Sequence, residues 1–217
     1  ALSIAGLGVD GGKDSLSMTV KFEDVEVSSF PSFVIESYAH IADFRRRVTP
    51  DLKNEDSKLL LINPSKLTGS LGCTALSESY DIAGSDTPDV DVKKAKKVFD
   101  LMQYLIRNEK ILAASPVQKG GLLSTLAKMK LSSNAGCYIE NLTDLNDVNF
   151  YFNEEVGMII QCSEKNLNQI KNLVKSYNLS YEMIGHVIRN GNYFEFTEKA
   201  NSLRAASKGV SPLSIPP

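Results

Sequence analysis

The stretch ILAASPVQKGGLLSTLAKM, residues 111–129, shows in one unit how this chain folds. Residues 111–114 are apolar and predict a short buried strand. A polar loop follows, and beyond the glycine pair at 120 and 121 the apolar residues 122, 123, 126 and 129 recur at helical spacing. The order strand, loop, helix predicts helices packed on a sheet.

Segments on either side extend this pattern. The apolar runs 59–62 and 156–162 have strand length, and the first is uniform enough to predict a strand buried on both faces. Apolar residues at intervals of three and four predict helices over residues 98–106 and 167–174. The first of these helices is predicted to begin at Thr87-Pro88, with the threonine as N-cap and the proline as first helical residue.

The remaining strand signals lie near the two ends of the chain. Alternation of apolar and polar residues predicts strand structure over residues 19–27, and residues 33–41 predict another strand. Near the other end, residues 181–188 and 193–196 predict a hairpin that turns over Asn190-Gly191. Because strands and helices interleave irregularly, with hairpins at both ends, we predict an α+β fold, a three-layer arrangement of a mixed β-sheet with packed helices.

The composition excludes several classes of function. The chain of 217 residues has 24 Lys and Arg against 26 Asp and Glu, which excludes the broad basic surface that nucleic acid or an anionic membrane requires. No apolar run approaches the roughly 18 residues of a membrane span, and the first residues do not resemble a secretion signal. The three cysteines lack the spacing of a metal site or a disulfide framework and are predicted to be reduced thiols. These features predict a soluble, cytoplasmic protein.

Two glycine-containing loops are the candidates for ligand binding. Gly11-Gly12-Lys13-Asp14-Ser15 combines backbone freedom, a cation and a hydroxyl, which are groups that hold a phosphate, although its spacing is not that of a Walker loop. At Gly120-Gly121 a predicted helix start offers backbone N–H groups, and Lys119 adds a positive charge. Each loop also has a simpler interpretation. The first can be a tight turn with a solvated lysine, and the second can use its glycines for close packing of helix and strand.

Other polar and reactive side chains give weaker signals. His40 and His186 lie in strand-like runs and are predicted to be structural. Cys73 lacks the flanking glycines of a nucleophile elbow and is expected to pack beside the following helix. Asn153-Glu154-Glu155 precedes a strand and forms either a metal or hydrogen-bond cluster or a pair of solvated or capping carboxylates. We therefore assign no catalytic and no metal-binding residue.

Longer motifs carry a family resemblance. Residues 12–18, GKDSLSM, closely resemble the G-K-D-S-x-S-M signature of the phosphoribosylformylglycinamidine synthase family, within the wider superfamily of aminoimidazole ribonucleotide synthetase. Further matches follow in register over nearly the whole chain, at residues 39–43, 48–50, 59–62, 71–76, 120–122, 126–127 and 152–157. The last of these contains the N-E-E-x-G variant, which is specific to the same family.

The resemblance implies a piece of an ATP-dependent purine-biosynthesis ligase. The family converts formylglycinamide ribonucleotide, glutamine and ATP to formylglycinamidine ribonucleotide, glutamate, ADP and phosphate. ATP and Mg²⁺ are then the implied cofactors, nucleotides the small-molecule substrates, and the remaining synthetase-like subdomains and the glutaminase domain of the same polypeptide the implied partners. Residues 1–28 would end an N-type subdomain, residues 29–199 would form the C-type subdomain, and residues 200–217 would be a tail or interdomain linker. The fragment alone is expected to be inactive.

One departure from the family concerns residues 115–121. Where the family has H-D-x-S-D-G-G, this chain has S-P-V-Q-K-G-G, and neither Pro116 nor Lys119 offers an anionic oxygen to magnesium. Either this half-site is degenerate and binds no metal-nucleotide, or Lys119 replaces the charge of the ion. The residues that the resemblance places near nucleotide or substrate are Gly12, Lys13, Asp14, Ser15, Gln118, Lys119, Gly120 and Gly121.

Two other functions fit the sequence less closely. The parent protein could be a non-catalytic scaffold or interaction relative of this enzyme, and a complete glutaminase triad in the parent would argue against that. It could also be another kinase or synthetase of the superfamily that acts on a different small molecule. That second alternative does not explain the G-K-D-S-x-S-M match.

Overall fold

The computed structural model describes residues 6, 8–13, 18–29, 34–41, 43–81 and 86–197. The chain divides into two compact units, Ala1–Phe44 and Arg45–Pro217, and each unit is described by itself. Among the described residues, no helix has both the length and the apolar character needed to cross a bilayer.

The first unit contains a β-hairpin. Strands β1 (Thr19–Phe22) and β2 (Val25–Ser28) pair antiparallel, so the strand-like run predicted over residues 19–27 is two short strands joined by a turn. Glu23 in that turn has a φ of 51°, which the tight reversal requires. The polar side of the hairpin carries a 3.3 Å ion pair between Lys21 and Glu26.

The strand predicted over residues 33–41 is wrong for the part that the structure describes. Residues 34–41 have no regular secondary structure, and Phe33 lies outside the described residues. Their large apolar side chains, among them Val34 and Tyr38, are exposed. A strand needs a neighbour to satisfy its backbone groups, and no described strand pairs with this segment. A short 3₁₀ helix follows at Phe44–Arg46.

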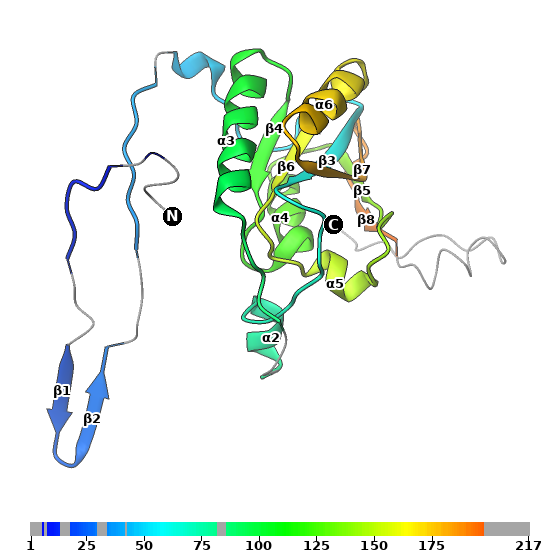
Figure 1. Cartoon of the computed structure of the whole chain (residues 1–217). Coiled ribbons are helices and arrows are strands. Elements are labelled where there is room, and N and C mark those ends of the chain that lie inside the picture. Colours follow the sequence, from blue (N-terminus) through cyan, green and yellow to red (C-terminus); the bar gives the residue numbers. More distant parts are fainter. Residues whose placement is uncertain are drawn as a thin grey trace, which may run out of the picture. The chain divides into compact units, whose positions relative to one another are not determined.

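The second unit is built on a six-stranded sheet in the order β4-β6-β3-β7-β5-β8 (Figure 1). Its strands are β3 (Ser57–Asn63), β4 (Ala113–Pro116), β5 (Gly136–Ile139), β6 (Met158–Cys162), β7 (Ser180–Ile188) and β8 (Phe194–Phe196). All pairs are antiparallel except β5 with β8, which is parallel. The sheet is therefore mixed, as predicted. The uniformly apolar run 59–62 lies in β3 and is buried at every position, which confirms that prediction.

Helices cover both faces of this sheet and make three layers. The helices are α2 (Ala75–Ser79), α3 (Val92–Arg107), α4 (Gly121–Lys130), α5 (Asp147–Tyr151) and α6 (Glu164–Ser176). On one face α3 and α6 bury their apolar stripes against Leu60 and Ile62 of β3 and Ile160 of β6. On the other face α4 and α5 pack on Leu59 and Leu61 of β3. Successive side chains of β3 therefore point alternately into two hydrophobic cores, one on each face of the sheet. The predicted α+β fold class with three layers is confirmed.

The hairpin predicted over Asn190-Gly191 is wrong. Strand β7 pairs with β5, and β5 in turn pairs with β8, so β5 lies between the two strands that sequence pairs. Close contact at the turn allows this crossing: a Cβ on Gly191 would lie 2.6 Å from Gly136 Cα at the start of β5. Cys137 N then donates to Tyr193 O at 2.9 Å, which starts the parallel pair.

The predicted start of the long helix is also wrong. Helix α3 begins at Val92, and its N-cap is Asp91, whose side chain accepts a hydrogen bond from Lys94 N at 3.1 Å. The segment Thr87-Pro88 lies outside the helix. An aspartate is at least as good an N-cap as a threonine, because its carboxylate also complements the helix dipole. Strand β5 and helix α5 are too short to give a clear periodic signal and were not predicted, whereas α2 is the helix expected after Cys73.

Candidate functional site

The loop between β4 and α4 turns sharply at two glycines. Gly120 is the N-cap of α4 with a φ of 93°, and Gly121 begins the helix with a φ of 75°. A Cβ on Gly121 would lie 2.6–2.7 Å from the backbone of Phe152, closer than real Cβ atoms come. Gly121 therefore serves close packing, as the simpler interpretation predicted for the pair, whereas a Cβ on Gly120 would meet Ser124 of the same helix. The partner is the segment after α5 rather than a strand.

Three backbone N–H groups of this loop are bonded inside the protein. Gln118 N donates to Thr125 Oγ1 at 2.9 Å, and Gly121 N donates to Gln118 O at 2.9 Å. Gly120 N donates to Glu154 Oε1 at 2.8 Å. A phosphate at this loop would compete with all three acceptors for its hydrogen bonds.

The side chains of the loop are engaged as well. Lys119 Nζ lies 2.6 Å from Glu78 Oε2, in an ion pair whose side chains are both mostly exposed. The hydrogen bond to Glu78 raises the pKa of Lys119, and the charges of Glu78 and Glu154 raise it further. Gln118 donates to Ser115 Oγ at 3.2 Å and accepts from Lys128 Nζ at 3.0 Å. The ammonium of Lys119 is therefore neutralised locally by the protein's own carboxylate.

Two adjacent glutamates, Glu154 and Glu155, accept hydrogen bonds from several segments around the loop. Glu154 Oε1 accepts from Gly120 N and also from Ala75 N at 2.8 Å, which links the first residues of α2 and α4. Glu155 Oε1 accepts from Thr68 Oγ1 at 2.7 Å and from Gly69 N at 2.9 Å. Of the alternatives predicted for these glutamates, the structure has the hydrogen-bond cluster, and Glu154 is also a capping carboxylate at the starts of α2 and α4. Asn153, which is buried, completes it by donating to Glu155 Oε1 at 2.9 Å.

The predicted phosphate loop near the start of the chain is only partly described. Gly12 and Lys13 are exposed, belong to the first unit and have no regular secondary structure. Asp14 and Ser15 lie outside the described residues. The structure thus brings Gln118, Lys119 and the two glycines after them into one loop. It does not test the contribution predicted for residues 12–15.

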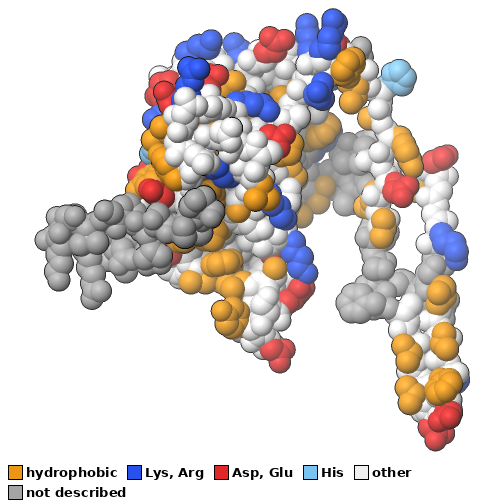
Figure 2. Space-filling model, turned by 180° about the vertical axis from the view of Figure 1, so that it is seen from behind, with side chains coloured by type: hydrophobic (Ala, Val, Ile, Leu, Met, Phe, Trp, Pro, Cys, Tyr) orange, Lys and Arg blue, Asp and Glu red, His pale blue; other side chains and the backbone are white. Residues whose placement is uncertain are grey.

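Beside the loop, the second unit has an apolar groove of about 700 Å³. Its walls are α2 and α4, and its lining residues are Ala75, Leu76, Ser79, Tyr80, Gly120, Leu123, Ser124, Ala127, Lys130, Leu131, Phe152 and Phe194. Figure 2 shows hydrophobic side chains gathered at the lower end of this unit, where α2 lies in Figure 1. The single charged lining residue is Lys130, and its Nζ donates to Ser133 O at 2.7 Å. The groove suits apolar groups and offers little to a polyphosphate.

The other reactive residues do not form a catalytic set. Burial raises the pKa of the Cys137 and Cys162 thiols to about 12, so neither is a thiolate nucleophile at neutral pH. Cys73 is exposed, so the expectation that it packs beside α2 is wrong. His186 lies in β7 as predicted, whereas His40 lies in the segment without a strand. Within the described residues, no three His, Cys, Asp or Glu side chains gather so as to hold a metal ion.

Comparison with known proteins agrees with this geometry. Residues 54–197 match the family model described as AIR synthase related protein, C-terminal domain. The chain belongs to this family. Over 188 residues it is 33% identical to the probable phosphoribosylformylglycinamidine synthase, chloroplastic/mitochondrial, of Arabidopsis thaliana. That match covers 84% of this chain and 13% of the Arabidopsis protein, so the chain spans about an eighth of that relative.

Solved structures show the same family fold. Thermotoga maritima PurL complexed with FGAR matches 72% of this chain and 28% of its own, with a TM-score of 0.59 and 14% identity. PurLQS from Thermotoga maritima matches 80% of this chain and 27% of its own, with a TM-score of 0.58 and 11% identity. At such identities the likeness concerns the fold alone. The resemblance predicted from the sequence motifs is therefore confirmed at the level of the family domain.

Proposed function

We propose that this chain is the C-type subdomain, with the end of the preceding N-type subdomain, of a phosphoribosylformylglycinamidine synthase. In this proposal the parent ligase converts formylglycinamide ribonucleotide, glutamine and ATP to formylglycinamidine ribonucleotide, glutamate, ADP and phosphate. The chain itself supports the catalytic half and does not turn over substrate. The identity to the Arabidopsis protein and the GKDSLSM motif at residues 12–18 support this assignment.

The observation that carries the supporting role is the bonding of loop 118–121. Gly120 N–H is held by the Glu154 carboxylate, and Lys119 is held by Glu78. A carboxylate thus lies where a nucleotide-binding loop would present its donors to phosphate. Of the two roles left open for Lys119, this arrangement favours the degenerate site over the replacement of a metal charge.

Magnesium does not fit the residues of this loop. Mg²⁺ requires hard oxygen ligands, usually with one or two carboxylates, and residues 115–121 contain no carboxylate. The carboxylates nearest to it in the hydrogen-bond network, Glu78 and Glu154, already bind Lys119 and Gly120. The role proposed for this loop therefore involves no metal ion. Any ATP and Mg²⁺ that the ligase uses are proposed to bind at other parts of the parent protein.

The domain boundaries and partners belong to the same proposal. Residues 1–28 would complete an N-type subdomain, residues 29–199 the C-type subdomain, and residues 200–217 would lead to the next part of the polypeptide. The partners would be the other synthetase-like subdomains and a glutaminase domain. A cytoplasmic location remains a prediction, and the Arabidopsis relative is named as chloroplastic/mitochondrial.

The test is calorimetric titration of ADP and ATP, with and without magnesium, into the whole synthase that contains this chain. We expect Lys119→Ala to leave the number of nucleotide sites and their affinities unchanged, as does the control Lys165→Ala, which changes an exposed lysine of α6. Loss of one magnesium-independent site in Lys119→Ala alone would contradict the degenerate site and establish charge replacement.

A ligase assay on the same protein separates the remaining alternative. Release of ADP that depends on both formylglycinamide ribonucleotide and glutamine is the expected result. Absence of this activity in a folded whole protein, judged by its circular dichroism, would instead favour the non-catalytic scaffold. The two measurements are independent, because the first concerns one loop and the second the whole parent.

A further inference from the structure

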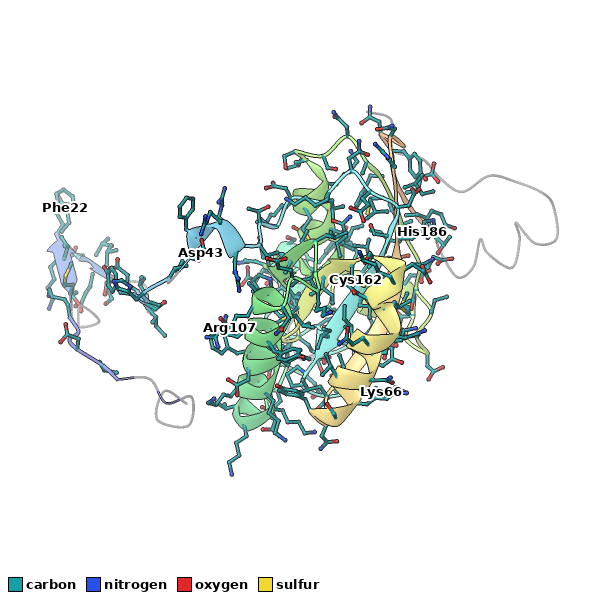
Figure 3. All side chains as sticks on the ribbon, turned by 90° about the horizontal axis from the view of Figure 1, so that it is seen from above. Phe22, Asp43, Lys66, Arg107, Cys162 and His186 are labelled. Atoms are coloured by element: carbon teal, nitrogen blue, oxygen red, sulfur yellow. The ribbon has the colours of Figure 1, made fainter. Side chains whose placement is uncertain are left out.

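One edge of this sheet face carries no helix among the described residues. Helices α3 and α6 bury their stripes against β3 and β6, and α6 also covers Tyr181 and Met183 in the first half of β7, but neither β5 nor β8 contributes a buried residue to that core. In Figure 1, β7, β5 and β8 lie on the side of the sheet away from α3. In Figure 3, the labelled His186 likewise lies on the side away from α3. Strands β5 and β8, with the end of β7 at His186, therefore present an uncovered surface on this face.

Strand register places four side chains in one row across this surface. Lys58 of β3 lies opposite His186 of β7, His186 opposite Tyr138 of β5, and Tyr138 beside Glu195 of β8. Residues that face each other across paired strands share one side of the sheet. The rings of Tyr138 and His186 are 5.0 Å apart between centroids and tilted by 36°. All four side chains are half-buried, so each keeps a part of its surface in solvent.

The two ends of the row differ in charge. At one end, Lys58 Nζ is paired with Glu164 at 3.4 Å. At the other end, Glu195 lies beside Tyr138, and Glu140 follows Tyr138 by two residues along the chain, which points it to the same side. Burial raises the pKa of the Tyr138 phenol, and the charges of Glu140 and Glu195 raise it further. Within the part of the chain that the structure describes, neither glutamate has an ion-pair partner.

We propose that this surface docks a basic protein segment and receives an arginine over the Tyr138 ring, between Glu140 and Glu195. An aromatic face attracts a cation, and a guanidinium can stack on the ring while it donates to carboxylates on either side. Arginine fits better than lysine, because its planar group uses the ring and both acids together. Nucleic acid fits poorly, because two unpaired carboxylates would repel its phosphates. The partner is thus defined by charge complementarity with Glu140 and Glu195.

The two histidines of the chain provide a direct readout. A proton NMR titration of the 217-residue chain with triarginine amide is expected to move the imidazole signal of His186 in a saturable way. His40, which lies in the first unit, is the internal reference and is expected not to move. Trilysine amide is expected to bind more weakly, and a triglutamate peptide is expected to leave both signals in place.

Variants make the test decisive. Glu140→Gln/Glu195→Gln should weaken triarginine binding about tenfold, since it removes both charges and keeps the side-chain shape. The matched control Glu23→Gln/Glu109→Gln changes two exposed glutamates outside the row and should bind as the unmodified chain does. No shift of His186 with triarginine, or an equal shift in the first double variant, would overturn the proposal. A His186 signal that moves with protein concentration alone would overturn it in favour of a second copy.

Discussion

Removing the Glu154 carboxylate is the perturbation whose effect follows most directly from the structure. One oxygen of this half-buried side chain accepts two backbone hydrogen bonds, from Ala75 N and Gly120 N, each at 2.8 Å. Both donors stand at helix starts, where backbone N–H groups have no partner within the helix. In Glu154→Ala the two donors lose their charged acceptor together.

The magnitude can be worked from these two bonds. A hydrogen bond to a charged group contributes about 1.5–3 kcal/mol, and a buried donor left without a partner costs about 1–3 kcal/mol. Because the site is only half-buried, water replaces part of the loss, and we expect Glu154→Ala to lower the free energy of unfolding by about 2–4 kcal/mol. Glu154→Gln keeps an acceptor oxygen without its charge and should cost about 1 kcal/mol.

The assay is urea unfolding followed by circular dichroism, with hydrogen exchange as a local readout. The control is Glu55→Ala, an exposed glutamate whose side chain accepts no hydrogen bond from any described residue. Exchange at the amides of Ala75 and Gly120 should accelerate in Glu154→Ala more than exchange in the central strand β3. If Glu154→Ala and Glu55→Ala unfold at the same urea concentration, the role given to Glu154 is wrong.

Three further outcomes follow from the same structure. Gly121→Ala should lower stability by about 2–4 kcal/mol in urea unfolding, since its φ is 75° and its Cβ would meet the Phe152 backbone; an unchanged midpoint would contradict the packing role. Iodoacetamide should modify Cys73 alone in the native chain and the two buried cysteines only in urea, which mass spectrometry detects. Burial raises the pKa of Glu182 above the ordinary 4.5, so the folded state favours its protonated form. The stability contributed by protonated Glu182 is therefore fully present below pH 4.5 and is lost as the pH rises through the raised pKa. Glu182→Gln should raise the free energy of unfolding at pH 7 and leave it unchanged in acid, as measured by unfolding curves at both pH values.

Local patterns predicted the elements that depend on local sequence. The run at residues 59–62 predicted the central strand, because a short apolar run that ends at Asn63-Pro64 has the length of a strand buried on both faces. The runs with apolar residues at intervals of three and four predicted the bodies of α3, α4 and α6, because that spacing places these residues on one face of a helix. The hairpin over Asn190-Gly191 failed because β8 pairs with β5, a strand more than fifty residues earlier in the chain. The residues of the turn do not indicate which strand β8 will pair with.

The candidate site was predicted only where its function rests on backbone shape. The glycines at 120 and 121 predict a tight turn at the start of a helix, and α4 begins with such a turn. The role of Glu154 was open, because its acceptor oxygen serves donors 79 and 34 residues away in sequence, at Ala75 and Gly120. The ion pair of Lys119 joins it to Glu78, 41 residues away, and was not predicted. Hydrogen bonds between distant segments depend on the fold and leave little trace in the residues that make them.

These long-range bonds show how the start of α4 satisfies a backbone donor within the protein. A helix start has N–H donors to satisfy, and leaving them without partners in a half-buried site is costly. A carboxylate supplied by the protein satisfies the donors and complements the dipole of α4, so Glu154 stabilises the loop in the absence of any ligand. The same contact joins α4 to α2 and so fixes both walls of the apolar groove. On this reasoning, Glu154 contributes to the rigidity of the second unit, and its substitution should lower the stability of that unit.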